Sequence, residues 1–474
     1  MLENITNLWD WILSSFEWIL GALFSNAIAV TGFILALVII LRIFREQRRP
    51  SSILAWSFFI IMIPYLGVPL YMLLGGRKLK KKIRAKGLLT DAIESQGSSI
   101  RIQDQFYTAG NKVKFLTDGQ IAFHAFSRAI KEAEHEIHIL TYILADDKVG
   151  NSLMDLLIVK ARQGVRVRLL IDALGSFHKP SRKIKSLKSA GGEVFTFMPA
   201  FPFQTHGWAN LRNHRKIAIF DNRLGILGGR NLDGRFMGED SDPDRFHDFG
   251  ATYEGPIVEC LNGVFLSDWA FASKQSLDSI TGLSPVSIGE SGLSNVAGIA
   301  SGPDVVGDLL YERLVNIIQE FENELVIVTP YFIPDEVLLR SLMVKARRGK
   351  RITLILPEKS NWLVVDFVRS QYLRELHEAG VNIQLFKEGM LHGKVLVADN
   401  KLLLHGSANF DIRSLFVNFE IGMIHTSKED LAPVFLWLEW LLDRSRAFGF
   451  EKELNPPRLR RSLEDAARLI APLL

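Results

Sequence analysis

The sequence contains the same set of four polar residues twice, at the same spacing. Each set holds a histidine, a lysine two residues later, an aspartate five residues after the lysine, and an asparagine 17 residues after the histidine. The two sets are His214, Lys216, Asp221 and Asn231, and His392, Lys394, Asp399 and Asn409. Side chains at positions i and i+2 of a strand lie on one face, so each set offers an imidazole and an ammonium group together. One such pair is usually a buried histidine beside a solvated lysine. The recurrence of the pair at matched spacing instead indicates a catalytic or binding role.

These residue types suit phosphate chemistry better than metal binding. Lysine is a poor metal ligand at neutral pH, and neither pair has a cysteine or carboxylate at ligand spacing, so we expect no metal and no cofactor. Two ammonium groups and two asparagine amides, with Ser407 as a further polar group, can hold the oxygens of a phosphodiester. One imidazole can attack phosphorus while the other protonates the leaving oxygen. Asp221 and Asp399 fall at the far ends of their strands, where we expect mainly structural or interdomain contacts.

A catalytic imidazole also needs a carboxylate behind it, to fix its tautomer and to stabilise its cation. Asp248 lies 34 residues after His214, and Glu420 lies 28 residues after His392. Both are candidates for this role, and the alternative for each is an ordinary surface acid.

The region from residue 116 to the end alternates between apolar strands and amphipathic helices, and one unit occurs twice. In the first copy, the strand 135–144 precedes a helix ending in KARQG and the strand 165–172. In the second copy, the strand 323–334 precedes a helix ending in KARRG and the strand 350–357. Two such copies predict two similar α/β domains, and the Ser- and Gly-rich residues 276–302 between them indicate a linker.

Two apolar stretches precede this region. Residues 18–41 and 50–76 are uncharged runs of 24 and 27 residues, and a helix that crosses a hydrocarbon layer needs about 20. We therefore expect membrane segments at about 18–41 and 53–74. A cleaved signal peptide is disfavoured, because the residues before the first stretch are acidic.

The basic run 77–86 follows the second stretch and has seven basic residues in ten. Next to a membrane segment such a run is expected to bind anionic headgroups, and the positive-inside rule then leaves residues 77–474 in the cytoplasm. If Pro64, Gly67 and Pro69 bend the second stretch, it becomes a re-entrant or interfacial segment, and residues 77–474 again lie in the cytoplasm.

Composition restricts the classes of function. The net charge is +4, from 56 basic and 52 acidic residues, so the chain lacks the overall charge of a nucleic-acid coat protein. The mean hydropathy of +0.14 is high for a soluble protein of this charge content. The aromatic stretch with Phe201, Phe203 and Trp208 just before the first histidine is a candidate lipid contact, or alternatively a loop that covers the core.

The doubled pattern HxKx4Dx6GGxN and HxKx4Dx6GSxN resembles the duplicated HKD motifs of the phospholipase D superfamily. Within that superfamily the chain is similar to the bacterial cardiolipin synthases in its AWSFFIIMIPYLGVPLYMLLG stretch, the NHRK around His214, TPYFIPDE at 329–336 and the ending ARLIAPLL. The resemblance implies two pseudo-symmetric α/β domains, each a mixed sheet flanked by helices, that share one active site behind an N-terminal helical membrane anchor. The expected divisions are a membrane region at 1–76, a basic juxtamembrane linker at 77–115, and the two domains at 116–285 and 286–474.

The resemblance also implies a reaction. A histidine attacks the phosphorus of phosphatidylglycerol, glycerol leaves, and the hydroxyl of a second phosphatidylglycerol displaces the histidine to give cardiolipin. By analogy His214 is the nucleophile and His392 is the general acid and then base, with Asp248 and Glu420 orienting the imidazoles.

The expected partners are phosphatidylglycerol and anionic membrane lipids, with no nucleic acid and with a homo-oligomer left open. The expected location is the bacterial inner membrane, with the catalytic domains on the cytoplasmic face. Two alternatives use the same motifs: a hydrolytic phospholipase D, and a phosphodiesterase that acts on nucleic acid.

Overall fold

The computed structural model describes residues 30–45, 50–74, 86–87, 91, 105–198, 211–276, 279–280, 289–305 and 307–469. The chain divides into two compact units, one of residues 1–76 with 206–210 and one of the remaining residues. Phe201, Phe203 and Trp208 lie outside the described residues, so the interpretation of that stretch as a lipid contact stays a prediction.

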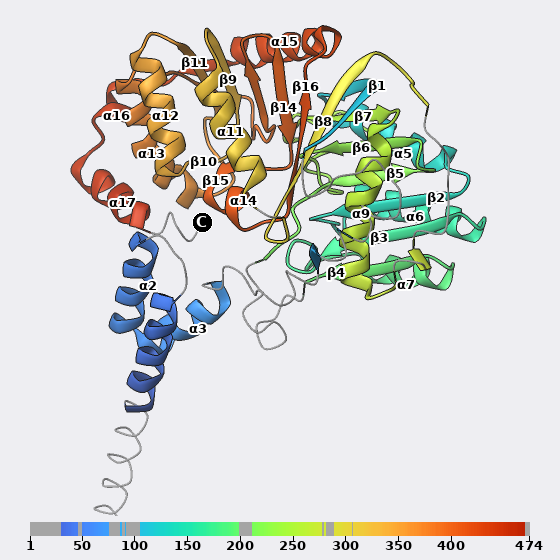
Figure 1. The fold of residues 1–474 in the computed structure, drawn as a ribbon, viewed down its shortest axis with the longest axis horizontal. Coiled ribbons are helices and arrows are strands. Elements are labelled where there is room, and N and C mark those ends of the chain that lie inside the picture. The colour runs from blue at the N-terminus through green and yellow to red at the C-terminus, as the bar shows by residue number, and fades with distance from the viewer. Residues whose placement is uncertain are drawn as a thin grey trace, which may run out of the picture. The chain divides into compact units, whose positions relative to one another are not determined.

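The first unit contains a helix at residues 30–45 and the helices α2 (Pro50–Met62) and α3 (Pro64–Leu74) (Figure 1). The second apolar stretch is therefore broken at Ile63, because a residue before proline is disfavoured in the helical conformation. A Cβ atom on Gly67 would lie 2.8 Å from Cα of Ile60, so glycine allows α3 to pack closely on α2. Within the described part of the chain, no helix has both the length and the apolar character needed to cross a bilayer.

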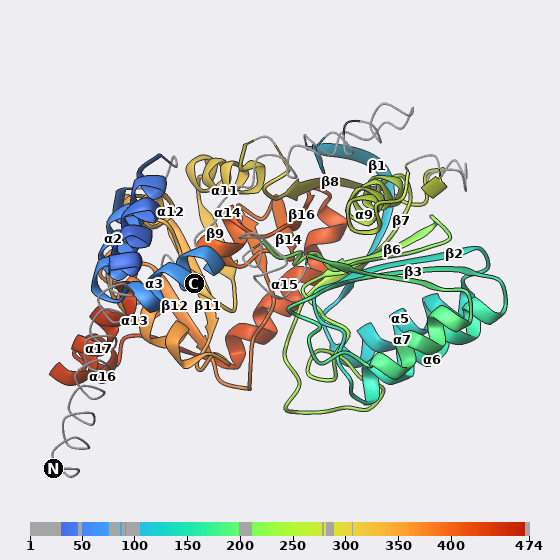
Figure 2. The same ribbon diagram turned by 90° about the horizontal axis from the view of Figure 1, so that it is seen from below.

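The second unit is built on one 15-stranded sheet. The elements of its first half are β1 (Phe106–Leu116), α5 (Gly119–Glu132), β2 (Glu136–Thr141), α6 (Lys148–Arg162), β3 (Arg166–Asp172), α7 (Ser181–Ser189), β4 (Glu193–Phe197), β5 (Ile217–Phe220), β6 (Leu224–Gly228), β7 (Gly250–Glu254) and α9 (Ile257–Ser273). Strands β2, β3 and β4 are parallel, while β5, β6 and β7 are antiparallel. Helices α5, α6 and α7 cover one face and α9 the other (Figure 2).

The second half repeats this order. Its elements are β8 (Ser294–Ser301), α11 (Leu309–Glu320), β9 (Glu324–Val328), β10 (Phe332–Ile333), α12 (Glu336–Arg347), β11 (Arg351–Pro357), α13 (Leu363–Glu378), β12 (Asn382–Phe386), β13 (Val395–Ala398), β14 (Leu402–Gly406), β15 (Phe410–Asp411), α14 (Ile412–Phe416), β16 (Glu420–His425), α15 (Lys428–Asp443), β17 (Ser445–Ala447), α16 (Glu451–Leu454) and α17 (Arg458–Leu469). The short strands β10 and β15 pair separately.

The strand order is pseudo-symmetric about its centre. It runs β17-β12-β11-β9-β13-β14-β16-β8-β1-β7-β6-β5-β2-β3-β4, so that β8 and β1 pair antiparallel at the middle and each half then follows the same sequence outwards. Among the described strands, β17 in this sheet and the separate pair β10 and β15 have no counterpart strand in the first half. The fold class predicted from the sequence, two similar mixed α/β halves, is confirmed, and the halves share a continuous sheet.

A buried cluster of charges lies directly behind the first histidine of the repeated motif. Asp268 on α9 accepts hydrogen bonds from Nη1 of Arg215 at 2.8 and 2.9 Å and from Nδ2 of Asn213 at 2.9 Å. Its carboxylate also lies 2.9 Å from Nζ of Lys86. Because Asn213 and Arg215 flank His214, this cluster fixes the backbone on both sides of that histidine.

The burial of Lys86 contradicts one prediction made from the sequence. It is the last residue of the basic run 77–86, which was expected to face anionic headgroups, yet it is 1% exposed and pairs with Asp268 and Asp304. The other residues of the run lie outside the described part of the chain. This lysine therefore fastens the segment before β1 to the core of the second unit.

Removing the Lys86 ammonium group should destabilise the fold. Lys86→Met leaves Asp304 buried without that partner, and breaking a buried ion pair from one side costs about 3–5 kcal/mol. The control Lys112→Met removes an exposed pair with Glu254 and should cost less than about 1 kcal/mol. Denaturant titration of the purified protein measures both free energies of unfolding, and equal losses would refute the role given to Lys86.

Candidate active site

Two backbone contacts bring the repeated motifs of the two halves together. The N–H of His214 donates to the carbonyl of Phe419 at 2.9 Å, and the N–H of His392 donates to the carbonyl of His247 at 2.6 Å. Phe419 immediately precedes Glu420, and His247 immediately precedes Asp248. Each histidine is thus bound, through its main chain, beside a carboxylate of the other half.

The side chains follow the same crossed pattern. Nδ1 of His214 lies 2.9 Å from Oε1 of Glu420, and Nδ1 of His392 lies 2.6 Å from Oδ2 of Asp248. Both carboxylates are fully buried. The sequence placed each acid downstream of the histidine in its own copy, whereas the structure pairs it with the histidine of the other copy. A carboxylate on Nδ1 makes that nitrogen the donor and leaves the Nε2 lone pair for reaction.

The two carboxylates are held by different neighbours. Glu420 accepts a hydrogen bond from Oγ of Ser407 at 2.5 Å and one from Nδ2 of Asn418 at 3.3 Å. At the position equivalent to Ser407 the first copy has Gly229, where a Cβ atom would lie only 2.2 Å from Oδ1 of Asp248. The second residue of the GG and GS dipeptides therefore differs for a reason. Gly229 makes room for the Asp248 carboxylate, whereas Ser407 donates a hydrogen bond to the Glu420 carboxylate.

The two lysines lie at the same place in each half. Nζ of Lys216 donates to the carbonyl of His214 at 2.5 Å. Nζ of Lys394 donates to the carbonyl of His392 at 2.6 Å and lies 2.9 Å from Nδ1 and 3.4 Å from Nε2 of that ring. Burial lowers the pKa of Lys216 to about 7 and that of Lys394 to about 8. Lys394 also lowers the pKa of Lys216, so the two ammonium groups converge on one region.

Burial favours the neutral form of both imidazoles. Burial, and next Lys394, lower the pKa of His392 to about 3, and burial lowers the pKa of His214 against the opposing effect of Glu420. Burial alone would raise the pKa of the Asp248 carboxyl, but His392 and Lys394 hold it far below its ordinary value. The site therefore presents two uncharged imidazoles backed by two carboxylates, which is the state a nitrogen nucleophile requires.

The aspartates of the two motifs stand away from the imidazoles. The Asp221 carboxylate accepts three backbone N–H bonds, from residues 134–136, at 2.7 to 2.8 Å. Asp399 accepts the corresponding bonds from residues 322–324 at 2.7 to 2.9 Å. Both adopt a left-handed backbone, with φ of +52° and +51°. Asp221 follows β5 and fixes the start of β2, which pairs with β5. Asp399 follows β13 and fixes the start of β9, which pairs with β13.

The two asparagines face local partners. Oδ1 of Asn231 accepts a hydrogen bond from the N–H of Ile143 at 3.2 Å. The side chain of Asn409 bonds to Asp411 and so lowers the pKa of that carboxyl, which burial raises overall. Oδ1 of Asn409 is buried and has no hydrogen-bond partner among the described residues. Asn409 lines the same small cavity as Lys394, and the role of both amides in holding phosphate stays a prediction.

Sequence reasoning missed two tyrosines that contact the imidazoles. Tyr142 packs edge-on against His214, with ring centroids 4.9 Å apart, and Tyr331 packs edge-on against His392 at 6.4 Å. Burial raises the pKa of Tyr142 to about 12, so its hydroxyl remains a donor. The signal was present in the repeat, because a Thr-Tyr and a Thr-Pro-Tyr follow the equivalent strands.

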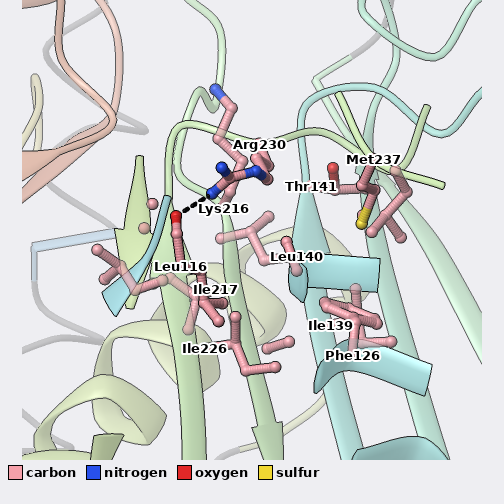
Figure 3. A pocket seen from close by; sticks show the side chains of 16 residues that line it. Leu116, Phe126, Ile139, Leu140, Thr141, Lys216, Ile217, Ile226, Arg230 and Met237 are labelled. Carbon is pink, nitrogen blue, oxygen red and sulfur yellow. Dashed lines mark hydrogen bonds between the residues drawn. The ribbon is translucent and has the colours of Figure 1, made fainter. Parts of the chain in front are cut away.

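A small apolar cavity lies under the lysine of each copy. The cavity in the first half has a volume of about 40 Å³, and Figure 3 shows the ammonium of Lys216 pointing away from its apolar side chains. Arg230, also on the lining, donates to the carbonyl of Leu116 at 2.7 Å. The counterpart under Lys394 has the same volume. Each has room for only a few water molecules, so a larger ligand must lie on the open side of the lysines. No cluster of metal ligands occurs among the described residues.

Comparisons with known proteins agree with this geometry. A family model described as "Cardiolipin synthase, PLD-like domain" matches residues 126–243 and 314–441, and one described as "Phospholipase_D-nuclease N-terminal" matches residues 33–76. A cardiolipin synthase of Halalkalibacterium halodurans is 31% identical, over 96% of this chain and 95% of that protein. One from Geobacillus thermodenitrificans is 32% identical, over 95% and 94%.

The fold also matches a solved structure. Phosphatidylserine synthase from Haemophilus influenzae superimposes with a TM-score of 0.60 at 15% identity, covering 81% of this chain and all of that one. This likeness concerns the fold alone. Because the first family model covers more than half of the residues and the curated relatives match nearly end to end, the chain belongs to the cardiolipin synthase family, phosphatidyltransferases of the phospholipase D superfamily.

Proposed function

We propose that this enzyme makes cardiolipin and glycerol from two molecules of phosphatidylglycerol, through a covalent phosphatidyl-histidine. The observation that carries the proposal is the crossed pairing of two imidazoles with two buried carboxylates, beside two convergent lysines. This arrangement supplies a nucleophile, an acid–base group and an anion clamp from the chain itself.

The proposed reaction has two steps. Nε2 of His214 attacks phosphorus, the bond from phosphorus to the glycerol oxygen breaks, and His392 gives that oxygen its proton. The hydroxyl of a second phosphatidylglycerol then gives its proton to His392 and attacks phosphorus, which releases His214. Each imidazole bonds through Nδ1 to a buried carboxylate of the other half, so the assignment of His214 as nucleophile follows the family resemblance.

His392 takes up a proton from solvent when the anionic substrate binds, because the electrostatics of the site then favour its charged form. Before substrate binds, burial and Lys394 keep His392 neutral. A phosphodiester anion beside the lysines offsets their charge, and a nearby negative charge raises the pKa of an imidazole. The general acid is therefore charged only when an anionic substrate occupies the clamp.

Transfer to a second lipid requires that water stay out of the site. We propose that the first unit holds the enzyme at the bacterial inner membrane, on its cytoplasmic face. The support is that large apolar side chains, among them Phe33, Phe58 and Ile61, lie exposed on its helices, which suits contact with lipid.

A hydrolytic phospholipase D remains the second candidate, because the same residues could deliver the intermediate to water.

The first prediction concerns the products and the two histidines. The purified enzyme given phosphatidylglycerol in mixed micelles should release cardiolipin and glycerol in equal amounts. His214→Ala and His392→Ala should each lower the rate by about 10²- to 10⁴-fold, while His124→Ala, on the outside of α5, should not. Phosphatidic acid as the main product would support the hydrolase instead. A histidine variant with near-normal turnover would refute the two-histidine mechanism.

The second prediction concerns the crossed carboxylates. Glu420→Gln keeps the size of the side chain but removes the charge that stabilises the His214 cation, so kcat should fall by about 10²- to 10⁴-fold with little change in KM. Glu254→Gln, at the surface, is the matched control. Mapping the acid-labile phosphatidyl adduct in each variant identifies the nucleophile. An adduct that accumulates on His392 would reverse the assignment of roles.

The third prediction concerns pH. Lys216 and Lys394 have pKa values of about 7 and about 8, so both are cationic below this range and neutral above it. The clamp thus loses its charge as the pH rises, and kcat/KM should fall from pH 7 to pH 9. Lys216→Arg, whose guanidinium stays charged, should move this decline to higher pH in whatever activity it retains. A kcat/KM that is flat to pH 9 would contradict the lowered lysine pKa values.

A further inference from the structure

A large cavity lies in the second half, apart from the motif residues. Its volume is about 820 Å³, and its walls come from α13, α16, α17 and the chain at the ends of β11, β12 and β17. Neither histidine, neither motif lysine and neither orienting carboxylate lines it. Cavities of about 300–1,000 Å³ are typical of ligand-binding sites, so this cavity is large enough to hold a ligand.

The lining combines apolar walls with an excess of positive charge. Apolar side chains such as Leu363, Phe367, Leu385 and Leu463 line it, together with six basic and four acidic side chains. The basic residues are Lys359, Arg369, Arg374, Arg446, Lys452 and Arg460. An amphiphile with a negative headgroup and hydrocarbon chains complements such a surface.

Arg369 adds an unused donor to this lining. It is 4% exposed, and its Nη2 bonds to Asp366 at 2.8 Å and to the carbonyl of Glu358 at 2.9 Å. Its Nη1 is buried and has no hydrogen-bond partner among the residues that the structure describes. A buried charged donor without an acceptor is costly, and an oxygen of a ligand phosphate would satisfy it.

The surface around the cavity is apolar and exposed. Trp362 and Leu363 at the start of α13 are 58% and 75% exposed, and Leu459 and Leu463 on α17 are 76% and 52% exposed. Leu363, Leu459 and Leu463 themselves line the cavity. An aromatic ring and leucines at an opening suit the interface of a bilayer, where such side chains are favoured. The source of the ligand is therefore a membrane.

We propose that this cavity binds one molecule of an anionic phospholipid, with its phosphate at Arg369 and its chains along the apolar walls, separately from the lipids that react. The cavity communicates with the active site through one loop. Glu358, Lys359 and Ser360 line the cavity, and the next residue, Asn361, accepts a hydrogen bond from Tyr331 at 2.6 Å. Tyr331 packs against His392, so an occupied cavity supports the residues around that imidazole.

Photolabelling tests the proposal without depending on the reaction. The probe is phosphatidic acid with a diazirine in one acyl chain, added in detergent to the full chain carrying His392→Ala, which prevents turnover. Label should map to peptides from residues 358–374 and 446–464. Unlabelled phosphatidylglycerol should compete for this labelling, whereas phosphatidylcholine and inorganic phosphate should not.

Two kinds of variant separate charge from volume. Lys359→Glu with Lys452→Glu reverses two exposed charges at the cavity and should lower labelling by about tenfold. Ser370→Trp fills the cavity and should lower it as well. The control, Lys188→Glu with Lys401→Glu, reverses two exposed charges elsewhere, and thermal unfolding checks that each variant is folded.

Three results would overturn the proposal. The first is labelling of these peptides that persists in both cavity variants. The second is equal competition by phosphatidylcholine, which would mean an apolar surface without charge recognition. The third is competition by inorganic phosphate, which would mean an anion site alone. Because cardiolipin formation is not the readout, each of these results leaves the proposed reaction standing.

Discussion

The structure depends on one interaction made twice, the bond between an imidazole of one half and a buried carboxylate of the other. Glu420 and Asp248 are both fully buried, and a buried carboxylate that loses its partner costs several kcal/mol. Each acid has donors in its own half, but its bond to an imidazole comes only from the other half. The interactions that join the halves are also those that orient the imidazoles, so assembling the sheet and assembling the site are one event.

The centre of the sheet keeps this arrangement in register. Tyr253 on β7 lies with its hydroxyl 2.7 Å from Nε2 of His405 on β14 and 3.2 Å from Nε2 of His425 on β16. Nδ1 of His425 in turn lies 3.0 Å from Asp430. Burial lowers the pKa of His405 well below its ordinary value, so it bonds as a neutral group. Because a slip of one residue turns every side chain to the other face, this network fixes β16, which carries Glu420, and β7, which begins two residues after Asp248.

Much of this could be read from the sequence, because duplication at matched spacing is visible without a structure. The two α/β halves followed from the repeat, and so did the residue types of the candidate site. The partner of each acid could not be read, since the distance along the chain from Glu420 to His392 is uninformative when two halves interlock. The burial of Lys86 was also hidden, because a lysine in a basic run looks the same whether it faces solvent or a buried carboxylate.

The two halves differ in the residues that hold the buried carboxylates. Each histidine bonds to a carboxylate of the other half and each motif aspartate accepts three backbone N–H bonds, but Gly229 stands where the other half has Ser407. The serine hydroxyl bonds to Glu420, whereas the glycine only makes room for Asp248. Asp248 therefore keeps its charge through His392 and Lys394, and Glu420 has a neutral donor in addition to His214. Two imidazoles with differently held carboxylates are no longer equivalent bases, so a division into nucleophile and acid–base group can arise from the residues behind the motif while the motif itself stays symmetric.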